Sequence, residues 1–185
     1  TADLATWTIS YSTTSTDLGA AQAKVSQDRA ALEAFFAELG FPADALQPTG
    51  ANVSSYTDDG VTRYTVRERL ALRTSDIEKA QQAVARQFDI VRRGVLIEEG
   101  SGMSYTFTKL NDIKPEMVAE ATRDARAAAE QFAEDSGADV GPIKEATQGY
   151  FSIDARDGDS SGGWGASDTP YKKVRVVTTV SFTLG

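Results

Sequence analysis

The 185 residues of the chain include no cysteine and no histidine. Without cysteine there are no disulfides and no thiolate ligands for a metal. Without histidine the chain lacks the commonest general base and the commonest metal ligand. No apolar run approaches the ~20 residues that a membrane-spanning helix needs. Neither a nucleophile–base motif nor a phosphate-binding loop stands out. We therefore identify no catalytic residue and no cofactor-binding residue, and we expect the protein not to be an enzyme.

The remaining composition is that of a soluble globular protein, with 41% hydrophobic and 25% charged residues. The length suffices for one sizeable domain or two small ones. A formal net charge of −8 repels phosphate backbones and anionic membrane surfaces. We therefore expect no nucleic-acid partner and no membrane insertion by this segment. The sequence begins at Thr1 without a signal peptide, so we expect any signal or anchor to have been removed.

One stretch, Asn111–Ile143, organises the rest of the prediction. Small and apolar residues recur in it at steps of three and four, which places them on one face of a helix. Pro115 suits the first turn of that helix, and Gly137 suits its end. We expect this face to be buried closely against a sheet, because most of its side chains are alanines: Val118, Ala121, Ala125, Ala128 and Phe132.

The first half of the chain predicts a strand, a helix and a hairpin. Leu4–Ser12 alternates as a half-buried strand does. An apolar stripe from Leu18 to Gly40, capped by Thr16 or Asp17, predicts a helix. Asp28 interrupts this stripe, and we interpret it as solvated. Residues 41–46 indicate a short turn of helix before the hairpin.

The hairpin consists of the strands 47–56 and 61–73 around the turn 57–60, whose Asp-Gly pair accepts positive φ. Alternation places four apolar side chains on one face of the second strand and a row of arginines on the other. Glu68 falls on the apolar face. The apolar set is Tyr64, Val66, Leu70 and Leu72, and the arginine row is Arg63, Arg67, Arg69 and Arg73.

The second half repeats this order after a further helix. Ser75 and Glu78 have capping-box spacing, and an apolar stripe including Val84 and Phe88 predicts a helix to Gly94. Residues 95–110 predict a strand interrupted at 100–102, and residues 143–154 a strand with an irregularity at Gly149. Residues 155–170 form a Gly/Ser/Asp-rich loop. The strand 172–184 closes the chain, with Val174, Val176, Val180, Phe182 and Leu184 inward.

This order predicts the α+β class, with a mixed or antiparallel sheet packed by long amphipathic helices. Two interleaved β-α-β-β units, approximately 4–73 and 95–184, are joined by the helix 75–93. The segments 31–54 and 128–152 share the series helix, glycine, short turn, strand. No linker of disordered composition separates the two units, so we interpret residues 1–185 as a single domain.

Several stretches resemble the SIMPL domain family of bacterial cell-envelope proteins. The likeness extends over the whole chain and is most specific in the second half. It is carried by Tyr105–Met117 (YTFTKLNDIKPEM), Ala119–Ala133 (AEATRDARAAAEQFA), Asp135–Gly137, Gly141–Gly149 (GPIKEATQG), Phe151–Ile153, Lys172–Val180 (KKVRVVTTV), Ala2–Trp7 (ADLATW) and Asp17–Gln22 (DLGAAQ).

The resemblance implies an α+β fold, a periplasmic location and a role in envelope stress physiology, and it brings no catalytic residues. Similar proteins carry a further strand upstream of the ADLATW stretch. We expect its absence to leave a sheet edge bare, so that this form is monomeric or weakly associated and a longer form oligomerises.

The acidic loop contains the one candidate metal site. Asp157, Asp159 and Ser161 occupy the first, third and fifth positions of a twelve-residue calcium loop, and Asp168 occupies the twelfth. Against calcium, both flanks predict strands, the last ligand is a short aspartate, and this composition is also that of any solvated hairpin loop. We favour a mobile hairpin connection without a metal and predict no cofactor.

Three classes of function remain open. The first, which we favour, is a non-enzymatic envelope protein that acts through a homo-oligomer or an envelope partner. The second is a carboxylate-based hydrolase, which needs Glu68 to converge with Glu98 or Glu99 in a cleft. The third is a small-molecule or calcium-binding module. The arginine row is a solvated sheet face, a face covered by the acidic side of a helix, or a surface for an anion or an acidic partner.

Overall fold

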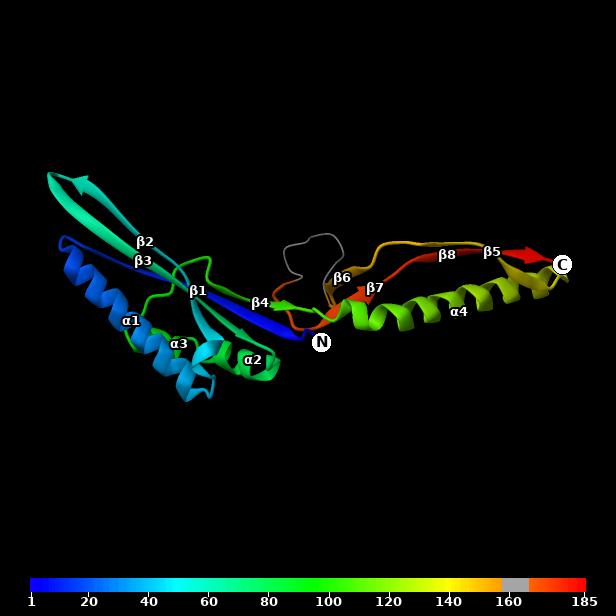
Figure 1. Cartoon of the computed structure of the whole chain (residues 1–185), viewed down its shortest axis with the longest axis horizontal. Coiled ribbons are helices and arrows are strands. Elements are labelled where there is room, and N and C mark those ends of the chain that lie inside the picture. The colour runs from blue at the N-terminus through cyan, green and yellow to red at the C-terminus, as the bar shows by residue number, and fades with distance from the viewer. Residues whose placement is uncertain (158–166) are drawn as a thin grey trace. The chain divides into compact units, whose positions relative to one another are not determined.

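A computed structural model describes residues 1–157 and 167–185 of the chain (Figure 1). It divides into two compact units, Ala2–Thr106 and Phe107–Gly185, and Thr1 is grouped with the second. All paired strands in the described residues are antiparallel, and helices accompany them in both units. The expected α+β class is therefore confirmed. We describe each unit by itself.

A four-stranded sheet forms the framework of the first unit. It contains β1 (Leu4–Ser15), β2 (Leu46–Asp58), β3 (Val61–Thr74) and β4 (Gly102–Thr106) in the order β2-β3-β1-β4. Asp59 and Gly60, with φ of 47° and 77°, make the tight turn between β2 and β3. Positive φ at both central residues suits a two-residue hairpin, so the Asp-Gly prediction is confirmed.

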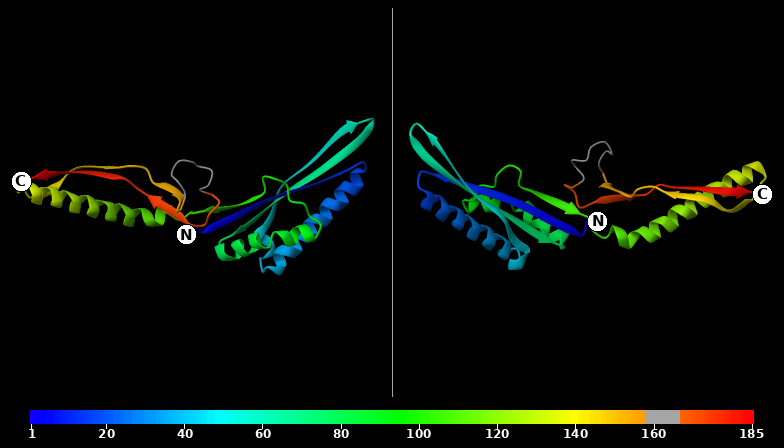
Figure 2. Two further views of the ribbon diagram at one scale, coloured as in Figure 1. Left: turned by 180° about the vertical axis from the view of Figure 1, so that it is seen from behind. Right: turned by 45° about the horizontal axis from the view of Figure 1, so that its top comes forward.

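One face of this sheet is covered by α1 (Leu18–Glu38), as Figure 2 shows. Asp17 caps the helix by accepting the Gly19 N–H at 2.8 Å, and Gly40 (φ 83°) follows its end. A single turn of 3₁₀ helix, η1 (Ala43–Ala45), then leads into β2. The core between helix and sheet consists mainly of Trp7, Ile9, Tyr11, Leu32, Phe35, Phe36, Leu70 and Leu72.

Asp28 lies inside this core, so the expectation that its side chain is solvated is wrong. Its side chain is buried and forms an ion pair with Lys24, one turn earlier on α1. Nζ of Lys24 also donates to the Gly94 carbonyl at 3.2 Å. The apolar stripe of α1 therefore runs straight through position 28, and a long lysine stem supplies the charge that a buried carboxylate needs.

The predicted helix between residues 75 and 94 is two helices, α2 (Ile77–Ala85) and α3 (Phe88–Arg92). Asp76 caps α2 by accepting the Lys79 N–H at 3.0 Å, so the Ser75–Glu78 capping box is wrong by one residue. The break falls at residues 86–87. It leaves Phe88, which the sequence analysis places on the apolar stripe, 68% exposed.

The segment after α3 forms less strand than predicted. Val95 is buried, and Ile97 makes an isolated bridge to Tyr11, but the regular strand β4 begins only at Gly102. The strand predicted over 95–110 with an interruption at 100–102 is therefore wrong: only Gly102–Thr106 forms a regular strand. β4 pairs with β1, which places the start of the second predicted repeat in the sheet of the first.

The second unit consists of α4 (Leu110–Ser136) and two short antiparallel ribbons. β5 (Val140–Gln148) pairs with β8 (Thr178–Leu184), and β6 (Ser152–Ala155) pairs with β7 (Lys172–Arg175). The strand predicted over 143–154 breaks at Gly149, where a Cβ atom would approach the Val177 carbonyl oxygen to 2.9 Å. The strand predicted over 172–184 breaks in the same place, at Val176–Val177.

The inward face of α4 differs from the predicted one in its last three turns. Val118, Ala121 and Ala125, expected to be buried, are half-buried, and Ala128 and Phe132 are exposed. The burial shifts to Ala133, because the contact follows steps of four residues and does not alternate between three and four.

Two other expectations for the second unit are wrong. Because α4 begins at Leu110, Pro115 lies inside the helix and not in its first turn. Leu184, expected inward on β8, is 64% exposed, whereas the other apolar residues predicted to face inward between residues 172 and 184 are half-buried. They are Val174, Val176, Val180 and Phe182.

We expect Ala133→Leu to lower the free energy of unfolding by ~1–3 kcal/mol, because the added side chain overpacks a buried position. Ala128→Leu, the same change on an exposed face of the same helix, serves as the control and should be nearly neutral. Urea denaturation of the two variants measures the difference. Equal losses would contradict the assigned helix face.

Candidate interaction surfaces

Glu68 belongs to a polar contact on the face of the sheet that α1 covers. The Tyr11 hydroxyl donates to Oε2 of Glu68 at 2.6 Å, and Nε of Arg29 lies 3.2 Å from the same oxygen. Burial, together with the hydrogen bond to Glu68, raises the pKa of Tyr11 above its ordinary value. One carboxylate thus joins β1, β3 and α1. Glu68 therefore links two strands and the helix that covers them, which is a stabilising role.

Glu98 lies on the opposite face of the same sheet. It accepts the Ser12 hydroxyl at 2.5 Å and Nε of Arg67 at 3.0 Å. The Ser12 hydrogen bond and the Arg67 contact lower the pKa of Glu98. Arg67 and Glu68 are consecutive on β3, so their side chains leave the sheet on opposite sides.

The two-carboxylate site that a hydrolase needs is therefore not formed by Glu68 and Glu98. Glu99 is no substitute, because it lines a shallow hollow with Glu98, Arg67 and Arg69 on the outer face. The hypothesis of convergence fails for a simple reason. The sequence does not indicate on which face of the sheet the loop before β4 runs. In the structure this loop places Glu98 and Glu99 on the outer face, opposite Glu68.

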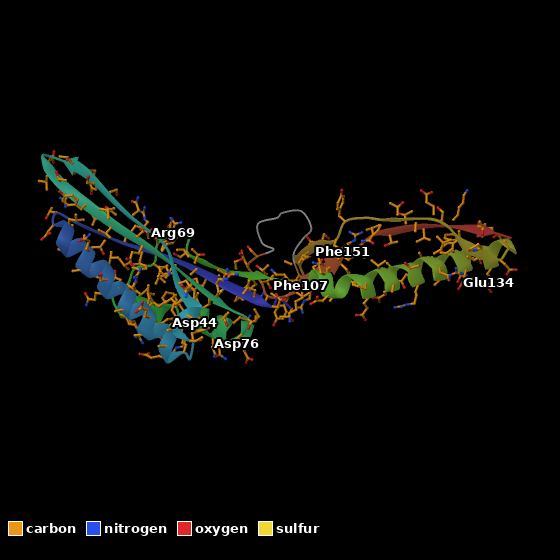
Figure 3. The ribbon with its side chains drawn as sticks, viewed as in Figure 1. Asp44, Arg69, Asp76, Phe107, Glu134 and Phe151 are labelled. Carbon is orange, nitrogen blue, oxygen red and sulfur yellow. The ribbon has the colours of Figure 1, made fainter. Side chains whose placement is uncertain are left out.

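The predicted arginine row is confirmed on that outer face. Arg63, Arg67, Arg69 and Arg73 are all exposed on β3, and Figure 3 labels Arg69 on the side of the sheet away from α1. Arg67 is neutralised by Glu98, and Arg69 lies close enough to contribute to the lowered pKa of Glu98. The row is open to an acidic group.

β2 is the most exposed element of the first unit. It stands at the end of the strand order, with β3 on one side and no strand of the described residues on the other. Every residue from Gln47 to Asp58 is exposed, including Val53 (51%) and Tyr56 (52%). β1 pairs with β3 only as far as Tyr64, so the tip of the hairpin extends past β1 (Figure 1). The structure thus presents a long bare strand edge.

An apolar pocket of about 330 Å³ lies beside the break between α2 and α3. Trp7 and Met103 belong to paired strands at its base, while Phe88, Val91 and Leu96 leave 45–73% of their surface exposed around it. Gln87 and Ser101 supply its polar groups, and none of the described residues that line it is charged. The sequence pattern does not indicate this pocket, because the pocket depends on the helix break that turns Phe88 outward.

The candidate calcium loop, which the sequence analysis weighs against a loop without a metal, lies only partly within the described residues. Asp159 and Ser161 lie outside them, as does most of the loop interpreted as a mobile connection. Asp157 accepts hydrogen bonds from Nε and a terminal nitrogen of Arg156, which lower its pKa, and Asp168 accepts one from Ser167. Across residues 1–157 and 167–185, no cluster of three acidic side chains is placed to hold a metal.

Comparison with models of protein families identifies the family of this chain. A family model described as SIMPL, protein of unknown function (DUF541), matches residues 1–183. The chain belongs to the SIMPL family. No curated protein matches the sequence. Within the described residues, no helix combines the length and the hydrophobicity that crossing a membrane requires.

The raised pKa of Tyr11 predicts a loss of stability at alkaline pH. The fold favours the neutral phenol, so its contribution is complete below the unfolded pKa of about 10 and is lost as pH rises above it. We expect the free energy of unfolding to fall less steeply above pH ~10 in Tyr11→Phe than in the natural sequence. Tyr150→Phe, at a side chain 99% exposed, is the control. Parallel curves for the natural sequence and Tyr11→Phe would disprove the assignment.

Proposed function

We propose that this SIMPL protein is a non-enzymatic component of the bacterial cell envelope that acts through self-association or partner binding in envelope stress physiology. The periplasmic location rests on the family resemblance. The binding role rests on one observation, the uncovered edge of β2. An exposed strand edge presents a row of unpaired N–H and C=O groups that another chain can satisfy.

The polar groups of the first unit support a binding role over catalysis. Glu68, Glu98 and Asp28 each have a cationic partner on a neighbouring residue or element: Arg29, Arg67 and Lys24. These contacts hold the three carboxylates in place. For Glu98 the Ser12 hydrogen bond and Arg67 also lower the pKa, which makes this carboxyl poorly suited to the proton exchange near neutral pH that a general acid or base performs.

The strand edge supports self-association in particular, because nothing on it repels a second copy. Between Leu46 and Thr57 the strand carries no charged residue, and lysines are the usual protection of an edge. Pro48 and the irregularity between Pro48 and Gly50 disrupt only the base of the strand. The remainder is free to pair.

We expect the protein to show a concentration-dependent mass in sedimentation velocity, and Val53→Lys to weaken the association at least several-fold by placing a charge on the edge. Val91→Lys is a matched control, since Val91 on α3 has a similar exposed fraction (45% against 51%). A monomer at every concentration would refute self-association. Equal effects of the two variants would remove β2 from the interface.

The apolar pocket supports a second candidate function, the binding of a small uncharged apolar molecule. Its volume of about 330 Å³ falls in the range of small-molecule sites, and two polar side chains among apolar ones are typical of them. The absence of a lining charge makes an ionic ligand unsuitable, because nothing would compensate its desolvation.

We expect N-phenyl-1-naphthylamine, an uncharged fluorescent probe, to bind this pocket and to quench the fluorescence of Trp7. Leu96→Ser should weaken probe binding several-fold, because Leu96 is 73% exposed beside the pocket and contributes apolar contact. Val53→Ser, an apolar-to-polar change far along the sheet, is the control. Probe binding that both variants reduce equally would exclude this pocket.

A further inference from the structure

We infer that two copies of the chain pair antiparallel along Gly50–Asp58 of β2, with Ser54 on the two-fold axis and Asp58 of each copy beside Arg69 of the other. This inference rests on the proposed self-association and specifies its geometry. It follows from three properties of the hairpin, namely its hydrogen-bonding pattern, its length and its charge distribution.

The hydrogen-bonding pattern decides which residues of β2 are free to bind. A two-residue turn closes on a hydrogen-bonded pair, here Asp58 with Val61, and bonded and non-bonded pairs alternate from there. The even-numbered residues of β2 therefore bond to β3. The odd-numbered residues, from Ala51 to Thr57, direct their N–H and C=O groups to the open edge.

The length of the regular strand sets the register. Pairing is regular from Gly50 to Asp58 and irregular before it. Antiparallel overlap of this whole segment with itself places Ser54 opposite Ser54, Val53 opposite Ser55 and Gly50 opposite Asp58. Outward-directed residues then meet outward-directed residues, so that the edge groups of both copies are satisfied. Any other register leaves part of the edge unpaired.

Charge complementarity supports the same register. Gly50 pairs with Arg69 on β3, and Asp58 lies on the same face of the sheet as Arg69. In the dimer, Asp58 of one copy lies opposite Gly50 of the other. Arg69 of that other copy lies beside its own Gly50, one strand further across the sheet. Gly50 has no side chain and has no atom within 4 Å of the space a Cβ would fill, so Arg69 can reach over it. Two symmetric ion pairs result.

The interface closes on itself. A two-fold pairing uses the same strand edge of both copies and leaves no further β2 edge exposed, so it yields a dimer and not a fibre. A single strand pair is smaller than a standard protein–protein interface, so we expect a dissociation constant on the order of micromolar.

A cysteine cross-link tests the register directly, because the chain has no cysteine of its own. Ser54→Cys places two thiols opposite each other at a non-hydrogen-bonded pair, where the Cα atoms are ~4.5 Å apart and a disulfide can form. Asn52→Cys on the same face of the same strand is the control. Its two copies lie ~14 Å apart along the strands, so it should not cross-link alone. Mixed with Tyr56→Cys, its partner in this register, it should.

A charge cycle tests the ion pairs by sedimentation equilibrium. We expect Asp58→Asn and Arg69→Gln each to weaken dimerisation about five- to tenfold, because each removes both symmetric pairs, and the double variant to lose no more than either single one. Arg73→Gln, in the same row but beyond the overlap, should have no effect.

The outcomes separate this inference from the proposed function. A monomeric natural protein refutes both. If the protein dimerises and Val53→Lys dissociates it, but Asn52→Cys cross-links as readily as Ser54→Cys, the β2 edge associates in another register and this inference alone fails. Additive losses in the charge cycle would likewise disprove the Asp58–Arg69 contact.

Discussion

The alternation of side chains along β3 is the constraint on which the first unit depends. Consecutive residues of this strand belong to two environments, one buried under α1 and one open to solvent. Arg67 binds Glu98 on the outer face, while Glu68 joins Tyr11 and Arg29 on the inner face. A register slip of one residue would bring the arginines under the helix and expose the core, so the register of β1 on β3 is strongly specified.

Because of this constraint, much of the first unit could be predicted from its sequence. The strand period, the Asp-Gly turn, the Asp17 cap and the arginine row are all local signals, and the structure confirms them. Local signals fail where a residue depends on a distant partner. Asp28 is buried because Lys24 reaches it and is itself held by the Gly94 carbonyl, a contact that spans 70 residues.

The candidate surfaces were predicted less well than the elements that carry them. The apolar pocket needs a helix break at residues 86–87, but the sequence there continues a helical pattern, so periodicity alone gives no warning. The separation of Glu68 from Glu98 depends on the path of the loop before β4. The open edge of β2 depends on the order of the strands in the sheet. The sequence of the hairpin indicates that β2 pairs with β3, but not whether another strand pairs with the other side of β2.

The second unit shows the cost of alanine at a helix–strand contact. Alanine lets α4 approach the strands closely but contributes little apolar area, and only Ala133 and Pro170 are buried among its described residues. With so little side-chain burial, several faces of α4 are nearly equivalent, so a sequence pattern specifies the contact only weakly. The predicted face is therefore correct at Val118, Ala121 and Ala125, which are half-buried. At the end of the helix it is wrong by one residue, because Ala133 is buried and Phe132 is exposed.

The distribution of charge on the β2–β3 hairpin is compatible with the proposed pairing of two copies of an acidic protein. The net charge of −8 opposes association at long range, but salt at physiological strength screens that repulsion beyond ~8 Å. At contact distance the local pattern decides, and the β2–β3 hairpin combines an acidic tip with a basic row. Antiparallel pairing is the arrangement that brings the tip of one hairpin to the row of another, whereas parallel pairing would place like charges together. In the proposed pair, the charges of the hairpin therefore favour the antiparallel orientation over the parallel one.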